Sequence, residues 1–332
     1  MASVNASVNL AFASVNDLEL AYDERGPKSG PAILLIMGLG TQMIAWPESF
    51  CNQLASAGFR VIRFDNRDIG LSTKLEDAPK IRLAGLLFNA LLGRKVKAPY
   101  SLEDMASDAV GLLDALDIDK AHIVGASMGG MIAQIVAAQY PERTLSLTSI
   151  MSSSGDPKLP RSKPKVNAVM FGRRPKPDDR EQLVRFGMKM FRTIGSPGYP
   201  TPPEVLRQKV EASIARSYYP AGTVRQFAAI IANGSRVDML KTIKAPTLVV
   251  HGSDDPLVPV EAGIDTAAHI AGSRLELIPG MGHDFPAELT PKLAADIITH
   301  CRAAREVIHE RTRGHYPGAI APEARAGGAG AL

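Results

Sequence analysis

One serine of this chain lies in a setting that makes a nucleophile. The pentapeptide Gly125-Ala-Ser127-Met-Gly129 fits the pattern Gly-x-Ser-x-Gly, which places a serine on a sharp turn between a strand and a helix. An apolar, strand-like run precedes it at 121–124, and a helical pattern follows at 128–139. The two glycines let neighbouring backbone approach without a Cβ clash. We therefore expect Ser127 to be a catalytic nucleophile.

A serine hydroxyl needs a base that takes its proton and an acid that orients the base. His283, on a glycine-rich loop after the last predicted strand, is the expected base. The six other histidines fall in predicted strands or helices, at a strand end or near the end of the chain. The acid is expected after the strand at 247–251, where Asp254 and Asp255 are adjacent and spacing alone does not choose between them.

Acyl transfer also needs two backbone N–H groups that stabilise the negative charge on the substrate oxygen. One is expected at Met128, the residue after the nucleophile. The other is expected at Leu39, which follows Gly38 in the loop after the apolar run at 32–37. The sequence therefore predicts an oxyanion hole made of the Leu39 and Met128 amides.

The elements around these residues alternate between short apolar runs and helical patterns, which predicts a mostly parallel sheet flanked by helices. Runs rich in Ile, Leu and Val indicate buried strands, which we expect at 32–37, 59–64, 121–124, 145–151, 247–251 and 274–278. Two alternating runs at 8–13 and 17–22 predict an antiparallel hairpin at the sheet edge. Helices are predicted at 46–57, 101–116, 128–139 and 288–307.

A segment from Ser152 to Arg236 interrupts this alternation. It holds several helical patterns, many prolines, and sixteen Lys/Arg against six Asp/Glu. We expect a helical cap over the serine here, with a core of 1–151 and 237–310 and a disordered tail of 311–332. The basic surplus could attract an anionic partner, but a solvated face is the favoured interpretation.

Apolar side chains of the cap are candidates for the substrate pocket, although packing within the cap explains each of them more simply. For Trp46, which follows the oxyanion loop, core packing is favoured over contact with a ligand. The pocket candidates are Trp46, Met170, Phe171, Phe191, Tyr218 and Tyr219. A second apolar helix is predicted at 81–96, and we expect it to be a further lid element; an interfacial helix or a dimer contact stay open.

Composition excludes several other classes of protein. The 332 residues are 45% hydrophobic and 22% charged, as in ordinary soluble globular proteins. No apolar run reaches the ~20 residues that span a bilayer, so stable membrane insertion is not expected. The N-terminus lacks a basic region followed by an apolar one, which favours the cytoplasm. Basic residues are scattered without a nucleic-acid-binding motif, so no nucleic-acid partner is predicted.

The two cysteines, Cys51 and Cys301, lie far apart in the sequence. We expect both to be free thiols, since this number and spacing do not make a disulfide framework. Neither has metal-ligand spacing with a histidine, so no metal is predicted.

From about Val15 to Val307 the chain resembles the α/β-hydrolase family, and it is most similar to bacterial carboxylesterases grouped with the polyketide (aclacinomycin-type) methylesterases and mycobacterial lipase/esterase-like proteins. The motifs that carry the resemblance are MGLGTQMIAWP, RFDNRDIGLS, VGASMGGMIAQ, HGSDDPLVP and PGMGHDFP. The resemblance implies an eight-stranded, mostly parallel sheet with a cap, and it favours Asp255 over Asp254. Many relatives carry His-Gly where this chain has Met37-Gly38.

These expectations point to a carboxylic ester hydrolase that forms an acyl-enzyme on Ser127, needs no cofactor and acts on a small-to-medium apolar ester. A lactonase, a C–C hydrolase or a cofactor-free perhydrolase would use the same residues. A binding or receptor protein with this fold and little turnover is the alternative from another class. An epoxide hydrolase or dehalogenase is disfavoured, because these need an acid where this chain has Ser127. The oligomeric state is left open.

Overall fold

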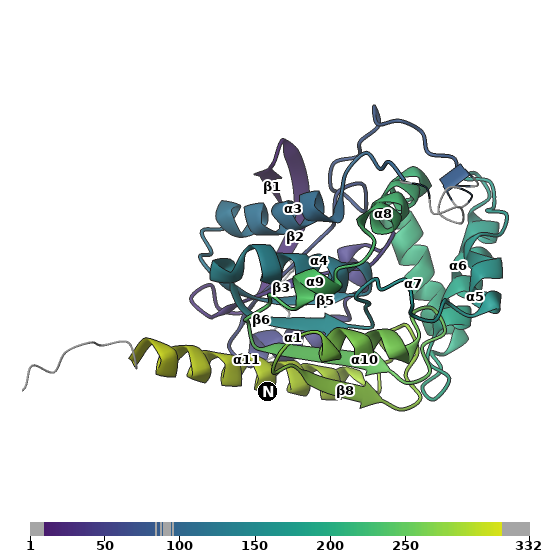
Figure 1. Ribbon diagram of the computed structural model, residues 1–332. Coiled ribbons are helices and arrows are strands. Elements are labelled where there is room, and N and C mark those ends of the chain that lie inside the picture. Colours follow the sequence, from purple (N-terminus) through teal and green to yellow (C-terminus); the bar gives the residue numbers. More distant parts are fainter. Residues whose placement is uncertain (1–9, 84, 87, 89–93, 95, 314–332) are drawn as a thin grey trace, which may run out of the picture.

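Eight strands form one sheet in the computed structural model, which describes residues 10–83, 85–86, 88, 94 and 96–313 (Figure 1). The strands are β1 (Ala11–Val15), β2 (Leu18–Arg25), β3 (Ala32–Ile36), β4 (Arg60–Phe64), β5 (Ala121–Ala126), β6 (Thr144–Ile150), β7 (Thr247–Gly252) and β8 (Arg274–Ile278). Their order is β1-β2-β4-β3-β5-β6-β7-β8. Strand β2 is antiparallel to both of its neighbours, and the pairs from β4 to β8 are parallel.

The predicted fold class is confirmed. All six strands predicted from apolar runs are present, and the hairpin at the sheet edge is β1 and β2. Five of the six are buried, whereas β8 lies at the other edge of the sheet and only its Ile278 is buried, so its predicted burial is wrong. Strand β3 shows why a continuous apolar run indicates such a strand, since all five of its residues are buried. A strand covered by helices on both faces has no polar side to present to water.

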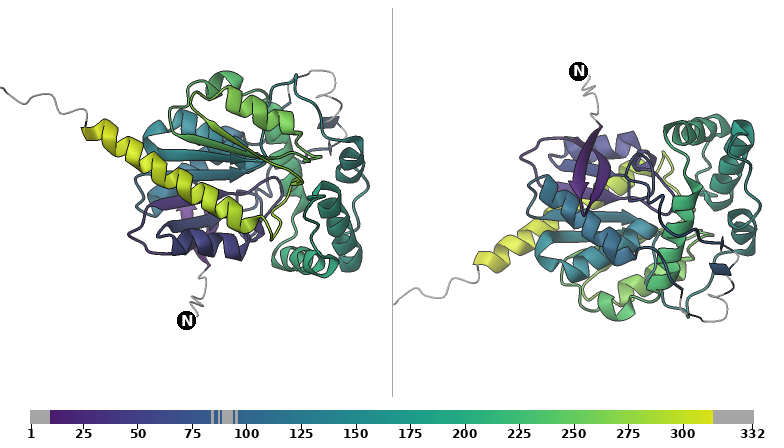
Figure 2. Two further views of the ribbon diagram at one scale, coloured as in Figure 1. Left: turned by 90° about the horizontal axis from the view of Figure 1, so that it is seen from below. Right: turned by 90° about the horizontal axis from the view of Figure 1, so that it is seen from above.

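Helices cover the sheet on both faces (Figures 1 and 2). One face carries α3 (Leu102–Ala115) and α4 (Met128–Gln139), and the other carries α1 (Glu48–Ser56) and α11 (Thr290–Arg313). Two short 3₁₀ turns, η1 (Met43–Ala45) and η2 (Pro141–Arg143), lead into α1 and β6. Helix α10 (Val260–Ala268), which packs on β7 and β8, was not predicted.

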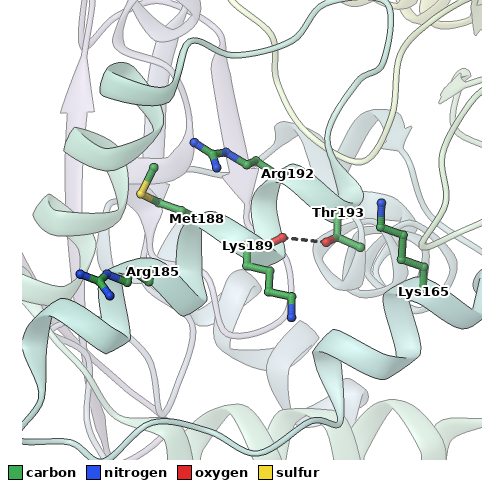
Figure 3. Close-up of a pocket in the computed structure, with 6 residues that line it drawn as sticks. All are labelled: Lys165, Arg185, Met188, Lys189, Arg192 and Thr193. Atoms are coloured by element: carbon green, nitrogen blue, oxygen red, sulfur yellow. Dashed lines mark hydrogen bonds between the residues drawn. The ribbon is translucent and has the colours of Figure 1, made fainter.

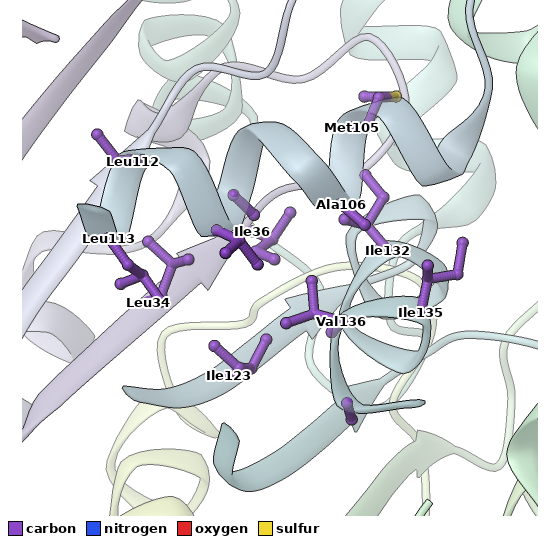
Figure 4. Close-up of a cluster of buried hydrophobic side chains, with 14 of the residues drawn as sticks. Leu34, Ile36, Met105, Ala106, Leu112, Leu113, Ile123, Ile132, Ile135 and Val136 are labelled. Atoms are coloured by element: carbon purple, nitrogen blue, oxygen red, sulfur yellow. The ribbon is translucent and has the colours of Figure 1, made fainter. Parts of the chain in front are cut away.

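The larger core cluster lies between the sheet and the α3–α4 layer (Figure 4). Leu34 and Ile36 of β3 meet Ile132 and Val136 of α4 there, and all four side chains are fully buried. Helix α3 begins at the predicted position, because the Ser101 side chain accepts a hydrogen bond from the amide of the third helical residue in a capping box. The core therefore fixes α4, and with it the turn that carries Ser127.

Five helices lie between β6 and β7, within and just beyond residues 152–236, which we call the inserted segment. They are α5 (Pro164–Met170), α6 (Arg180–Ile194), α7 (Pro203–Arg216), α8 (Pro220–Asn233) and α9 (Val237–Leu240). Proline begins α5, α7 and α8, where its missing N–H costs no helical hydrogen bond. In Figures 1 and 2, α5, α6 and α7 stand beyond one end of the sheet, past the carboxyl ends of its parallel strands.

The C-terminal helix is longer than predicted. Helix α11 continues to Arg313, so the predicted helix end at Val307 is wrong, while the tail at 311–332 stays a prediction. After Pro291 in the first turn of the helix, no glycine or proline occurs before Gly314 to stop it. The rest of the tail, 314–332, and most of the predicted helix at 81–96 lie outside the described residues. None of the described helices is long and apolar enough to cross a lipid bilayer.

Candidate active site

The strand order reverses at β3, which is flanked by β4 on one side and β5 on the other. The loops that leave β3 and β5 therefore diverge at their carboxyl ends, and open α/β sheets bind ligands at such a point. The loop after β3 carries Leu39, and the turn after β5 carries Ser127. The topology thus brings together two segments that lie about a quarter of the chain apart.

Ser127 occupies a strained turn between β5 and α4. Its φ of 56° and ψ of −121° lie in a region that non-glycine residues rarely adopt, at a typical cost of about 1–3 kcal/mol. The surrounding backbone holds this conformation, because the Ser127 N–H donates to the Ile150 carbonyl at 2.9 Å. The flanking glycines are required by space: a Cβ at Gly129 would lie 2.0 Å from the Ile36 oxygen, and one at Gly125 would lie 2.0 Å from the Gly129 oxygen.

Ser127, His283 and Asp255 form one chain of hydrogen bonds. Ser127 Oγ lies 2.9 Å from His283 Nε2, and His283 Nδ1 lies 2.6 Å from Asp255 Oδ2. His283 is 8% and Asp255 3% exposed, so little water competes for either contact. If Nδ1 carries the proton that it donates to Asp255, the Nε2 lone pair faces the serine hydroxyl. This is the arrangement that general-base activation of a serine requires.

The two adjacent carboxylates after β7 have different surroundings. Asp255 Oδ1 accepts hydrogen bonds from the Leu257 and Val258 amides, both at 2.8 Å, which leaves Oδ2 for His283. Asp254 is exposed, and its carboxylate accepts from the Gly280 amide at 2.9 Å. The geometry therefore places Asp255 against His283, whereas Asp254 ties the loop after β7 to the loop before His283.

A second histidine, His251, lies beside Asp255, which the sequence did not indicate. His251, the penultimate residue of β7, is fully buried, and its Nε2 lies 2.9 Å from the Val258 carbonyl and 3.7 Å from Asp255 Oδ2. Burial lowers the pKa of His251 below its ordinary value, and the carbonyl partner and Asp255 oppose that shift only in part. His251 is therefore neutral at pH 7 and packs against the acid without adding charge.

The loop after β3 passes directly over the serine. A Cβ at Gly38 would lie 3.1 Å from Ser127 Cβ and 3.5 Å from Ser127 Oγ, so a larger residue there would press on the serine. Leu39 follows Gly38, and Met128 begins α4 right after the serine. Within the described part of the chain, neither the Leu39 amide nor the Met128 amide donates to a protein acceptor. Both N–H groups are thus free to bind an oxygen of a substrate.

The end of α6 holds the loop that carries His283. The His283 N–H donates to the Ile194 carbonyl at 2.7 Å, and the Gly282 N–H donates to Ser196 Oγ at 2.8 Å. Ser196 donates in turn to Asp284 from both its hydroxyl and its N–H. Burial raises the pKa of Asp284, and the Ser196 hydrogen bonds counteract part of that rise. Sequence reasoning missed Ser196 because 86 positions separate it from Gly282.

The six predicted pocket residues have diverse surroundings. Trp46 is fully buried and packs on Phe50 and Phe285 at centroid distances of 5.5 and 5.0 Å, in the core between the sheet and α1, as the favoured interpretation held. The half-buried Phe171 packs on Phe227. Of the remaining four, Met170 and Tyr219 are half-buried, and Phe191 and Tyr218 are 38% and 37% exposed. No described hydrogen bond or aromatic contact joins any of these six side chains to Ser127 or His283.

A hollow of about 440 Å³ lies on the inserted segment (Figure 3). Four of its six lining residues are cationic; the lining consists of Lys165, Arg185, Met188, Lys189, Arg192 and Thr193. Four of the sixteen basic residues of 152–236 thus lie around this hollow, on α5 and α6. Ser127, His283 and Asp255 do not line this hollow.

Metal-ligand clusters and paired thiols do not occur among the described residues. No group of three or more His, Cys, Asp or Glu side chains there is arranged to hold a metal ion. Cys51 and Cys301 are both buried and unpaired. Burial raises the pKa of the Cys51 thiol to about 11 and that of Cys301 to about 12, so neither is a thiolate at neutral pH.

The chain is similar in sequence to a known family and to several known enzymes. Residues 31–288 match the family described as alpha/beta hydrolase fold. Rhodomycin D methylesterase DauP of Streptomyces sp. (strain C5) is 29% identical over 304 residues, which cover 84% of this chain and 93% of that protein. The 2-hydroxy-6-oxononadienedioate/2-hydroxy-6-oxononatrienedioate hydrolase of Cupriavidus pinatubonensis is 27% identical over 257 residues, or 76% of this chain and 80% of that protein.

Solved structures agree on the fold. The enol-lactonase from Burkholderia xenovorans LB400 has a TM-score of 0.64 and 22% identity, with 87% of this chain and 99% of that chain covered. The predicted resemblance to α/β-hydrolase esterases is therefore confirmed, and polyketide methylesterases are among the relatives. The family match over most of the chain, together with the sheet that carries the Ser127 turn, shows that this protein belongs to the α/β hydrolase family.

Proposed function

We propose that the protein is a serine carboxylic ester hydrolase with Ser127 as nucleophile, His283 as general base and Asp255 as the orienting acid. The observation that carries this proposal is the unbroken hydrogen-bond chain of 2.9 and 2.6 Å from Ser127 through His283 to Asp255. The strained turn at Ser127 and the free amides beside it support the same chemistry. Relatedness to a methylesterase supports an ester as the substrate.

In the first half of the reaction, Ser127 Oγ attacks the ester carbonyl carbon while His283 Nε2 takes the hydroxyl proton. The carbonyl oxygen becomes an oxyanion, which the Leu39 and Met128 N–H groups stabilise. Asp255 accepts from Nδ1 and stabilises the imidazolium ion that forms. His283 then gives its proton to the alcohol oxygen as the C–O bond breaks, which leaves an acyl group on Ser127.

In the second half, water replaces the alcohol. His283 takes a proton from the water as its oxygen attacks the acyl carbon, and the same two amides bind the second oxyanion. Collapse returns the proton to Ser127 and releases the carboxylic acid. The two halves use one base and one oxyanion site, so the described residues supply every proton transfer.

The ester is proposed to be small to medium in size and apolar, with a small alcohol such as methanol as leaving group. The similarity to a rhodomycin D methylesterase, which covers 93% of that protein, favours a small leaving alcohol. The apolar character of the ester follows from the apolar composition of the inserted segment, to which Phe171 and Phe227 belong.

A panel of p-nitrophenyl esters and aromatic methyl esters tests the proposal, with Ser127→Ala as the matched variant. We expect turnover by the wild-type protein and a loss of about 10⁴-fold or more in kcat on substitution. Absence of hydrolysis across the panel, together with absence of labelling by a fluorophosphonate, would refute the esterase proposal. Rapid fluorophosphonate labelling without turnover would instead favour a binding protein of this fold.

A C–C hydrolase is the second candidate, because one relative is named for a substrate with a ketone and two carboxylates and no ester. Such a reaction would need water to attack a ketone carbon and a carbanion to leave. A vinylogous 1,5-dioxo acid offered to the same wild-type protein separates the two. Faster turnover of that acid than of every ester would favour the second candidate.

A further inference from the structure

One buried amide connects the inserted segment with the loop that carries Leu39. Gln226 of α8 has no exposed surface, and its side-chain oxygen accepts a hydrogen bond from the Gly40 N–H at 2.9 Å. Its side-chain nitrogen donates to the Arg67 carbonyl, in the loop after β4, at 3.0 Å. Both polar atoms of the side chain are therefore used, and they join the loops that follow β3 and β4 to α8.

Gly40 also packs closely against α8. Gly40 has a φ of +64°, and a Cβ there would lie 2.7 Å from Thr223 Cγ2 and 2.8 Å from Thr223 Oγ1 on α8. Only glycine fits against the helix in this conformation. The position of α8 therefore sets the position of Gly40, and with it the Leu39 amide one residue earlier.

A buried ion pair fixes α8 on the core. Arg225 donates to both carboxylate oxygens of Asp68 at 2.7 Å, and the two side chains are 4% and 0% exposed. The same loop is held again two residues after Gly40, where the Gln42 side chain donates to the Ser213 and Ser217 carbonyls at 2.7 and 2.9 Å. The loop over Ser127 is thus bound to α7 and α8 rather than to the sheet alone.

We propose that Gln226 is a positioning residue, which holds the Leu39 amide where the oxyanion forms. This inference rests on the proposed function, since it assigns the Leu39 amide to the oxyanion. Donors of this kind act fully only when they are held within about 0.5 Å of the productive geometry. The inserted segment then contributes to the chemical step as well as covering the serine.

The test compares Gln226→Met, which keeps the side-chain volume and removes both hydrogen bonds, with Gln134→Met as the matched control. Gln134 is equally buried, but its described hydrogen bonds are with Ser149 and Arg236 and not with the loop that carries Leu39. For Gln226→Met we expect kcat to fall about 10- to 100-fold with KM unchanged within about 2-fold, since small displacements of reacting groups cost this much. Gln134→Met is expected to keep the wild-type kcat.

The inhibition constant of a trifluoromethyl ketone is measured as well, because a loss of stability alone does not change it. Ser127 Oγ adds to its carbonyl carbon, the hydroxyl proton passes to His283, and the product is a tetrahedral oxyanion. In Gln226→Met its inhibition constant should rise by the factor by which kcat/KM falls, whereas the corresponding secondary alcohol should bind as in the wild type. Equal weakening of ketone and alcohol, or the same losses in Gln134→Met, would overturn the inference.

A second variant, Gln226→Glu, keeps an acceptor for the Gly40 amide, and burial against the Arg67 carbonyl favours the protonated carboxyl group, whose O–H can donate to that carbonyl. We expect it to keep kcat and ketone affinity within about 5-fold of wild type, and it serves as the test if Gln226→Met does not fold. Losses in Gln226→Glu as large as 100-fold would contradict a role through Gly40. A wild-type protein that hydrolyses no ester would instead refute the proposed function, so the two failures are distinct.

Discussion

Two neighbouring aspartates show how environment, rather than residue type, assigns a role. Asp255 is buried and divides its oxygens between two backbone amides and His283. Asp254 faces solvent and holds the Gly280 amide. Spacing in the sequence left both open, and the resemblance favoured Asp255. The direction of each side chain depends on the turn after β7, which a linear pattern does not encode.

Substitutions of Asp255 and Asp254 should therefore lower kcat by very different factors. Asp255→Asn keeps the shape, but its oxygen stays with the Leu257 and Val258 amides, so its NH2 group faces His283 Nδ1. This donor disfavours the His283 tautomer with the proton on Nδ1, which is the one that can accept the serine proton. We expect kcat to fall about 10³- to 10⁴-fold, as for triad aspartates in general. Asp254→Asn is expected to stay within about 10-fold of wild type. Steady-state kinetics on one p-nitrophenyl ester measures both, and comparable losses in the two variants would contradict the assignment.

At the scale of elements, the sequence predicted the core well because each core strand and helix satisfies its own local pattern. The buried strands are continuous apolar runs, and α3 has its capping box. Helix α10 was missed because it is short and begins directly after Pro259 without a polar N-cap. The contacts of Ser196 and Gln226 escaped prediction because they join residues 86 and 186 positions apart.

The end of α6 is expected to position the loop that carries His283. In Ser196→Ala the Gly282 N–H loses its acceptor and Asp284 loses a hydroxyl donor, so the loop beside His283 is less firmly held. We expect kcat to fall roughly 10-fold with KM unchanged, and Ser196→Thr to restore most of the loss.

Ser146→Ala is the control for this prediction, because the Ser146 hydroxyl is also buried but bonds His122 away from the serine. It should lower stability without lowering kcat. A Ser196→Ala protein with wild-type kcat, or a Ser196→Thr protein as impaired as Ser196→Ala, would show that this contact does not position His283.

At the scale of the whole molecule, buried histidines link stability to pH. Burial lowers the pKa of His122 to about 3, well below its ordinary value of 6.5, and it lowers the pKa values of His251 and His300 as well. A histidine with a lowered folded pKa stabilises the fold fully above the unfolded pKa. That contribution is lost as the pH falls from about 6.5 toward the folded pKa, because the unfolded chain then binds the proton more readily.

His122→Gln tests this linkage, because the amide can still bond Ser146 but does not titrate. Between pH 7.5 and pH 4.5 the wild-type protein should lose about 2–3 kcal/mol more unfolding free energy than the variant, at about 1.4 kcal/mol per pH unit below 6.5. Urea unfolding at both pH values measures the difference. The same pH dependence in both proteins would show that His122 is not kept neutral by the fold.

The most direct measurement of the central claim is the site and chemistry of covalent labelling. The wild-type protein, Ser127→Ala and His283→Ala are each treated with a fluorophosphonate, digested and mapped by mass spectrometry, with ester turnover recorded in parallel. We expect one stoichiometric adduct on the peptide that contains Ser127, which abolishes turnover in the wild type. The adduct should form far more slowly in His283→Ala and be absent in Ser127→Ala. An adduct on another residue, or ester hydrolysis that survives full modification of Ser127, would contradict it.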